Sequence, residues 1–147
     1  MRKNKVFIIA EAGVNHDGDL KKALKLGDIA KKSQADAIKF QTFKPGEITG
    51  LYTKKSNYMK KNFKSDLSRY ELSKKMSLTY ENFKKINQYC KRKKIMFLST
   101  PDGEDSLNFL VKVLKIPIIK IGSSEITNYE YLGKIAKKNK PIFLSTG

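Results

Sequence analysis

The sequence predicts an α/β fold in which short parallel strands alternate with helices. Five apolar runs rich in β-branched residues recur along the chain, at 6–10, 37–43, 95–98, 116–121 and 142–144. The stretches between them carry apolar residues at helical spacing. The strand runs are apolar on both faces, which is typical of a sheet covered by helices. With 147 residues the chain is long enough for one domain with its own core.

Four helices are predicted between and after these strands. The first is expected to begin after Asp19, a residue type that caps helices, the second near Thr79 and the last near Asn128. The third matches the i, i+3, i+4, i+7 pattern from Leu107 onward. The residues expected to face inward are Leu20, Ala23, Leu24, Gly27, Ala30, Phe83, Ile86, Cys90, Leu107, Leu110, Val111, Leu114, Leu132, Ile135 and Ala136.

The connection from 44 to 67 shows no sustained period and holds Pro45, Gly46, Gly50 and many lysines. A connection of this length in a compact domain is either a functional lid or a mobile insertion, and both interpretations stay open. It leaves the carboxyl end of the second strand, the edge at which parallel α/β folds place their sites.

Composition narrows the function classes. The net charge is +17, but all except three of the 31 basic residues are lysine, which argues against a specific nucleic-acid reader. A basic surface would instead help to steer anionic substrates. No apolar run approaches the length of a membrane span, and no signal peptide is apparent, so we expect no membrane partner. The single cysteine, Cys90, fits a cytoplasmic protein. Neither G-x-G-x-x-G nor a P-loop pattern occurs, which argues against a dinucleotide-binding domain.

Polar residues gather where the predicted strands end. Lys39 and Lys120 each interrupt an apolar strand, and a buried ammonium needs an anionic partner or must lose its charge. An internal salt bridge of Lys120 with Glu11 or Glu125 would satisfy one of them. Two lysines at equivalent places, surrounded by small hydroxyl residues, favour an anionic ligand such as a phosphate or a carboxylate.

The remaining polar residues allow several roles. Glu11 and Glu125 are candidates for a general acid and base, or for acceptors of sugar hydroxyl groups. His16 is the only histidine, and a role in orienting the Glu11 loop is favoured over metal ligation. A strand lysine can also form a Schiff base if its pKa is depressed.

Five segments in this order, IIAEAGVNHDG, AIKFQTF, FLSTP, KIGSSEITNY and PIFLSTG, closely resemble the N-terminal part of the sialic acid synthase family. That family includes the N-acetylneuraminate, legionaminate and pseudaminate synthases. The resemblance covers essentially the whole chain apart from 44–67. It implies a TIM-type (β/α) barrel, present only as an incomplete N-terminal portion of about five strands spanning residues 1–147. The C-terminal antifreeze-like domain of the family would be absent.

The same resemblance implies condensation of phosphoenolpyruvate with an N-acetylated hexosamine, with release of phosphate. The positions that match the phosphoenolpyruvate pocket are Lys39, Thr100, Lys120, Ser123 and Ser145; Glu11 and Gln41 match the sugar side. A divalent metal, typically manganese, would polarise the sugar aldehyde, and its histidine ligands would lie outside this chain. A homo-oligomer is possible in such a family.

This sequence departs from the family pattern in two places and leaves two other functions open. Asp102-Gly103 follows Thr100-Pro101 where the family usually has a bulky aromatic, which puts the sugar-side wall in doubt. Ser123-Ser124-Glu125 replaces the usual Ser-Gly-Glu. The chain is expected to be a fragment that is inactive alone. The alternatives are a lysine Schiff-base aldolase and a non-catalytic remnant that keeps the anion pocket.

Overall fold

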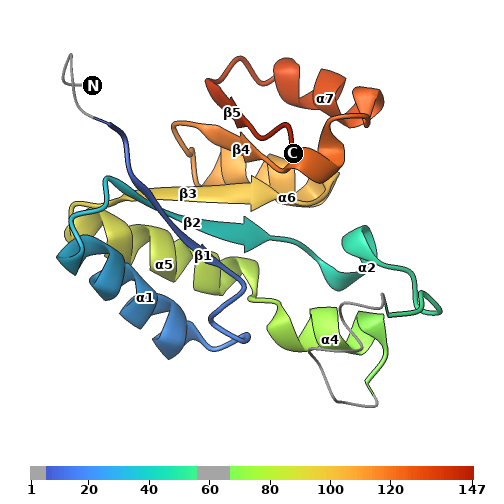
Figure 1. Ribbon diagram of the computed structural model, residues 1–147, viewed down its shortest axis with the longest axis horizontal. Helices are drawn as coiled ribbons and strands as arrows, with labels where there is room; N and C mark the ends of the chain where they lie inside the picture. Colours follow the sequence, from blue (N-terminus) through green and yellow to red (C-terminus); the bar gives the residue numbers. More distant parts are fainter. Residues whose placement is uncertain (1–5, 56–66) are drawn as a thin grey trace.

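The computed structural model describes residues 6–55 and 67–147 and confirms the α/β class. Strands β1 (Ile9–Gly13), β2 (Ala37–Thr42) and β3 (Met96–Pro101) pair in parallel, in that order, in one sheet. Strands β4 (Ile119–Ile121) and β5 (Ile142–Leu144) form a second parallel pair. β4 runs beside β3, so the five strands follow one another in chain order (Figure 1).

The predicted helices form, and three begin where their capping residues indicate. α1 (Leu20–Lys32) is capped by Asp19, α5 (Tyr80–Arg92) by Thr79 and α7 (Tyr129–Ala136) by Asn128. Each capping side chain accepts hydrogen bonds from backbone N–H groups of the first turn that have no partner within the helix. The prediction that Ala136 faces inward was wrong. Ala136 is exposed, because Tyr131 and Ile135 form the buried face of α7.

The third predicted helix changes its winding. It begins as α6 (Glu104–Asn108) and continues as a π-helix over Phe109–Val113, in which the Leu114 N–H donates to the Phe109 carbonyl five residues earlier. The wider turn lets Phe109 join Leu107, Leu110 and Leu114 in the core.

Two helices inside and after the 44–67 connection were not predicted. α2 (Pro45–Ile48) is a single turn that begins with a proline, and α4 (Arg69–Met76) begins with a capping box in which Ser68 and Glu71 bond each other's backbone N–H. Both lie beyond the carboxyl ends of β1 and β2 (Figure 1). The central part of the predicted loop, 56–66, lies outside the described residues, so its role as a lid or an insertion stays untested.

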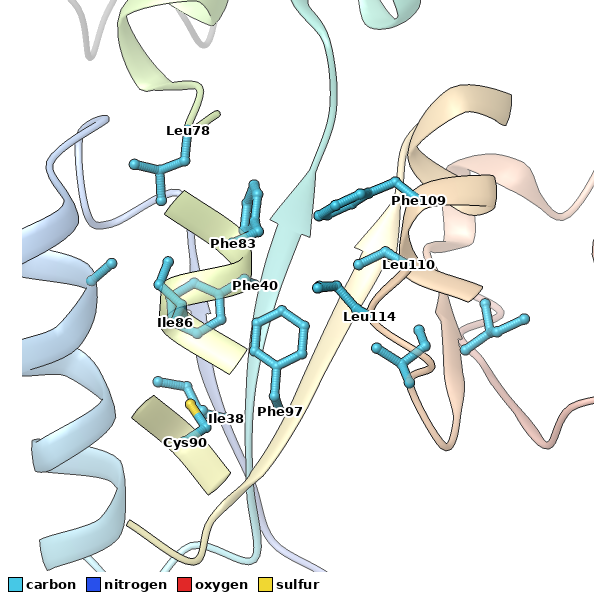
Figure 2. Close-up of a cluster of buried hydrophobic side chains, with 14 of the residues drawn as sticks. Ile38, Phe40, Leu78, Phe83, Ile86, Cys90, Phe97, Phe109, Leu110 and Leu114 are labelled. Carbon is cyan, nitrogen blue, oxygen red and sulfur yellow. The ribbon is translucent and has the colours of Figure 1, made fainter. Parts of the chain in front are cut away.

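The main core fills the space between the strands and the helices that cover their outer face. Phe40 of β2 and Phe97 of β3 stack with ring centroids 5.8 Å apart, and α5 contributes Phe83, Ile86 and Cys90 (Figure 2). The π-helix closes the other side with Phe109 and Leu110, and Leu114 follows directly after it. Burying these side chains, at about 1.5–3 kcal/mol each, holds the helices against the strands.

The opposite face of the strands, which α1 and α5 do not cover, carries the site. Near the amino ends of the strands, this face carries a small apolar cluster formed by Ala37, Leu98 and Ile118, with Phe143 packed against it. Because side chains alternate along a strand, the residues two positions further along point to the same face. In β2 and in the segment 118–121, which ends in β4, these next residues are Lys39 and Lys120, so the polar site begins directly beside this apolar cluster.

No helix in the part of the chain that the structure describes is both long enough and apolar enough to cross a membrane.

Candidate functional site

The Lys39 ammonium is buried and forms an ion pair with Glu11. Glu11 of β1 lies opposite Lys39 of β2 in the parallel register, and Lys39 Nζ lies 2.8 Å from Glu11 Oε2. The Lys39 side chain is 11% exposed and that of Glu11 is 59% exposed. An internal salt bridge is therefore present, but it involves Lys39 and not Lys120, the lysine for which the sequence suggested one. Since Glu11 is open to solvent, the Lys39 charge is still accessible from the strand ends.

Lys120 reaches the same face from β4. Its ammonium donates to the Ile121 carbonyl and to Ser145 Oγ, which joins two predicted site residues from β4 and the end of β5. Burial lowers the pKa of Lys120, the positive charge of Lys39 lowers it further, and the Glu11 carboxylate partly opposes both effects. The two lysines thus lie close enough to repel each other, a repulsion that a bound anion would relieve.

Gly13 gives Glu11 and Gln41 the room to converge. It has φ +50°, and a Cβ at this position would lie 3.0 Å from Glu11 Oε1 and 3.4 Å from Gln41 Oε1. A glycine meets both demands, because it adopts the left-handed conformation without strain and has no side chain. The Glu11 and Gln41 side chains are therefore neighbours at the ends of β1 and β2.

Asp102 belongs to this group of residues, although the sequence analysis did not assign it a role. The Gln41 amide donates to its carboxylate over 3.4 Å, and Thr100 lies opposite Gln41 in the register of β2 and β3. Burial raises the pKa of Asp102 to about 6, an effect that the Gln41 hydrogen bond and the Lys39 charge only partly offset. The only sequence signal was its position directly after Thr100-Pro101, where the family usually has an aromatic.

Glu125 and Ser123 lie in the 3-10 turn that follows β4, the strand that carries Lys120. The Asn128 amide donates to Glu125 Oε2 over 2.8 Å, and the Glu125 charge contributes to the raised pKa of Asp102. Ser123 is exposed. Glu125 shares with Asp102 an open cavity of about 260 Å³ that is lined by Glu47, Asp102, Gly103, Glu104, Glu125, Asn128, Glu130, Tyr131 and Lys134.

His16 lies away from these groups, on the side of the strands that faces the helices. It is 1% exposed, its ring centroid lies 6.1 Å from that of Phe40, and Nδ1 accepts the Gly18 N–H. Burial lowers its pKa, so the ring is neutral at pH 7. These contacts are consistent with the predicted role in orienting the loop after β1.

The structure thus brings Glu11, Lys39, Gln41, Lys120 and Ser145 together with Thr100, and places Glu125 and Ser123 on an adjoining turn. Lys39 and Lys120 carry the positive charge of this surface, Glu11 pairs with Lys39, and the Asp102 carboxylate is within electrostatic range of both Lys39 and Glu125. Such an arrangement can bind an anion on the lysines and a hydrogen-bonding ligand beside them.

Comparison with known proteins identifies the relatives of this chain. The N,N'-diacetyllegionaminic acid synthase of Campylobacter jejuni is 46% identical over 97% of this chain and 42% of its own length. The enzyme of the same name from Legionella pneumophila is 43% identical over 96% of this chain and 39% of its own length. The chain therefore spans about two fifths of the length of these relatives.

Solved structures agree with the sequence relatives. The N-acetylneuraminic acid (sialic acid) synthetase from Leptospira borgpetersenii, in complex with citrate, superposes with a TM-score of 0.82 at 35% identity, over 98% of this chain and 45% of that one. A truncated 3-deoxy-D-arabino-heptulosonate 7-phosphate synthase from Thermotoga maritima has a TM-score of 0.62 at 14% identity, over 100% of this chain and 45% of that one, which is a likeness of fold alone. The model of the NeuB family matches residues 26–147, most of the chain. With these relatives and the motifs at its strand ends, this chain belongs to the NeuB family, that of the sialic acid synthases.

Proposed function

We propose that this chain supplies the anion-binding half of an enzyme that condenses phosphoenolpyruvate with an N-acetylated hexosamine to form a nonulosonic acid. The observation that carries the proposal is the convergence of Lys39 and Lys120 on one strand face, beside the apolar cluster and Ser145. Family membership supports the same reaction, since the named relatives are acid-sugar synthases.

In this proposal the two lysines, with Thr100, Ser123 and Ser145, hold the phosphate and carboxylate of phosphoenolpyruvate. An anion placed between the ammonium groups removes their mutual repulsion and stabilises their charged forms. The bound anion must also share Lys39 with Glu11, whose exposed carboxylate is free to turn toward the sugar.

The reaction forms one carbon–carbon bond and releases phosphate. C3 of phosphoenolpyruvate attacks the aldehyde carbon of the open-chain sugar, the aldehyde oxygen takes up a proton, water adds at C2 and phosphate leaves. Glu11 and Glu125 are the candidates for donating and accepting these protons. Gln41 is placed to hydrogen-bond the sugar. The lysine charges would stabilise the negative charge that develops on the leaving phosphate.

The residues that the structure describes do not form a metal site. No group of three His, Cys, Asp or Glu side chains among them is placed to hold a metal ion. A requirement for a divalent ion such as manganese, bound by ligands outside this chain, stays a prediction. A TIM-type barrel of which this chain is the N-terminal part, a cytoplasmic location and a homo-oligomer are further parts of the proposal.

One observation favours a second candidate, a Schiff-base aldolase. The lowered pKa of Lys120 is a property that an amine nucleophile needs at neutral pH. Borohydride trapping of a carbonyl substrate on Lys120 would support this candidate, whereas a sugar-dependent release of phosphate without trapping would support the condensation.

Binding of phosphoenolpyruvate tests the anion site directly. Calorimetric titration is expected to show binding to the wild-type chain and a loss of at least about tenfold in affinity for Lys39→Met and Lys120→Met, since each removes one charged hydrogen-bond donor. Lys93→Met is the matched control, because Lys93 pairs with Asp28 on the helix-covered side. Equal binding by all four proteins would refute the proposed anion site.

Phosphate release tests the reaction itself. Phosphoenolpyruvate, manganese and a panel of N-acetylated hexosamines are incubated with the chain, and inorganic phosphate is measured. We expect no release from the 147-residue chain alone. Release that requires both sugar and metal would establish the reaction and refute the inactivity of the isolated chain. Phosphoenolpyruvate binding without release, even when the chain is fused to the remaining length of a relative, would instead favour a non-catalytic anion-binding protein.

A further inference from the structure

The carboxylate of Asp102 lies at the boundary between the lysines and the acidic cavity. It accepts the Gln41 amide over 3.4 Å, the charge of Lys39 lowers its pKa, and the charge of Glu125 raises it. Asp102 is therefore within electrostatic range of one group from each side. A ligand that contacts both Lys39 and Glu125 would therefore lie near the Asp102 carboxylate.

The turn that carries Asp102 is held on both sides. The Tyr131 hydroxyl lies 2.9 Å from the carbonyl oxygens of both Pro101 and Gly103, the residues that flank Asp102. Glu47 packs so closely on the other side that a Cβ at Gly103 would lie 2.4 Å from its carboxyl carbon. Because the backbone is fixed at both neighbours, Asp102 cannot move far to avoid an unfavourable ligand.

The charges around the cavity do not compensate Asp102. Among the described residues, Lys134 is the only basic residue that lines the cavity. It already forms ion pairs of 2.9 Å with both Glu104 and Glu130. Within the described residues the Asp102 carboxylate accepts the neutral Gln41 amide, and the Lys39 charge offsets its burial only in part. A second anion entering here would meet negative charge without a free cation to neutralise it.

We propose that Asp102 is a specificity-determining residue, which accepts hydrogen bonds from an uncharged amino sugar and rejects a sugar that carries its own phosphate. This inference rests on the proposed function, because it places the sugar beside Gln41 and the phosphoenolpyruvate on the lysines. The neutral sugar offers hydroxyl and amide N–H donors that a carboxylate accepts. The phosphate of a sugar phosphate would lie near the negative Asp102 carboxylate in a partly desolvated site. This repulsion disfavours the phosphorylated sugar relative to the neutral one.

The test compares one sugar with and without its phosphate. N-acetylmannosamine and N-acetylmannosamine 6-phosphate are titrated into the chain with inorganic phosphate present at a concentration that fills the lysine subsite. We expect the wild-type chain to bind the neutral sugar at least about tenfold more tightly. Asp102→Asn should reduce that ratio several-fold by admitting the sugar phosphate, and Asp102→Glu, which keeps the charge, should retain most of it.

Asp105→Asn is the matched control. Asp105 lies in the first turn of α6, pairs with Lys44 at 2.6 Å and does not line the cavity, so its removal should leave the ratio unchanged. Equal binding of the two sugars by wild type, an unchanged ratio in Asp102→Asn, or no binding of either sugar would each overturn the role of Asp102. A separate titration with phosphoenolpyruvate distinguishes the two proposals, since its failure to bind overturns the proposed function and its binding leaves only the specificity inference at stake.

Discussion

Replacing Asp102 by Asn should stabilise the fold at neutral pH. Burial raises the pKa of this carboxyl from 3.8 to about 6, so the folded protein binds its proton more tightly than the unfolded chain does. The stabilising contribution of the protonated form is fully present below the unfolded pKa and is lost as the pH rises through about 6. At pH 7.5 the wild-type protein therefore carries an ionised carboxylate that the fold disfavours.

The size of the effect follows from the pKa difference. A shift of about two units corresponds to about 3 kcal/mol, because each unit is worth about 1.4 kcal/mol. Asp102 lines an open cavity, so solvent screening reduces this figure, and a gain of about 1–2 kcal/mol is expected for Asp102→Asn. The neutral amide of Asn keeps the shape of the side chain and can still accept the Gln41 hydrogen bond.

Urea denaturation between pH 4 and pH 8 measures the free energy of unfolding of both proteins. The difference should be largest above pH 7 and should fall toward zero near pH 4, where Asp102 is largely protonated. Glu81→Gln serves as a control, since Glu81 is an exposed carboxylate of α5 paired with Lys84, and its loss should cost less than about 0.5 kcal/mol. A variant that is no more stable than wild type at pH 7.5, or a difference that does not depend on pH, would refute the reasoning.

Two further changes probe the strand ends. Binding of phosphoenolpyruvate should take up protons at alkaline pH and weaken as the pH rises further, because the pKa of Lys120 is lowered in the free site and a bound anion raises it again. Calorimetry in buffers of different ionisation enthalpy measures the proton uptake, and no uptake at any alkaline pH would contradict the coupling. Gly13→Ala should lower the free energy of unfolding by about 1–2 kcal/mol, because the left-handed backbone disfavours a Cβ that would also press on Glu11. Gly133→Ala, where the Cβ meets nothing within 4 Å in helix α7, should be neutral or stabilising in the same urea titration, and an equal loss in both variants would discount the special role of Gly13.

Local patterns predicted the parts of this fold that local interactions determine. The capping residues Asp19, Thr79 and Asn128 placed the starts of three helices, because each supplies the hydrogen bond that a helix needs at its first turn. α2 and α4 escaped prediction for the opposite reason. They are short, and α4 buries only Leu72 and Ser73, so their apolar pattern is too weak to stand out among the lysines.

The site residues also separate into those that local sequence predicts and those that depend on contacts between distant segments. The two strand lysines stood out because a charge within an apolar strand is unusual at any position. The pairing of Lys39 with Glu11 depends on the register between β1 and β2, which no single strand encodes. The environment of Asp102 depends on two distant residues. Gln41 precedes it by 61 residues, and Glu125 lies on the separate turn after β4. Interactions between distant segments cannot be inferred from local periodicity.

The way Tyr131 holds the turn after β3 has a consequence for how the enzyme family can diversify. Its hydroxyl lies 2.9 Å from the carbonyl oxygens of Pro101 and Gly103 and accepts the Gly103 N–H over 3.4 Å, so these hydrogen bonds all go to the main chain of the turn. Position 102 can therefore change from an aromatic to a carboxylate while the main chain keeps its path. If Asp102 selects the sugar as proposed, a substitution at this position changes the choice of sugar while the main-chain contacts of Tyr131 remain in place.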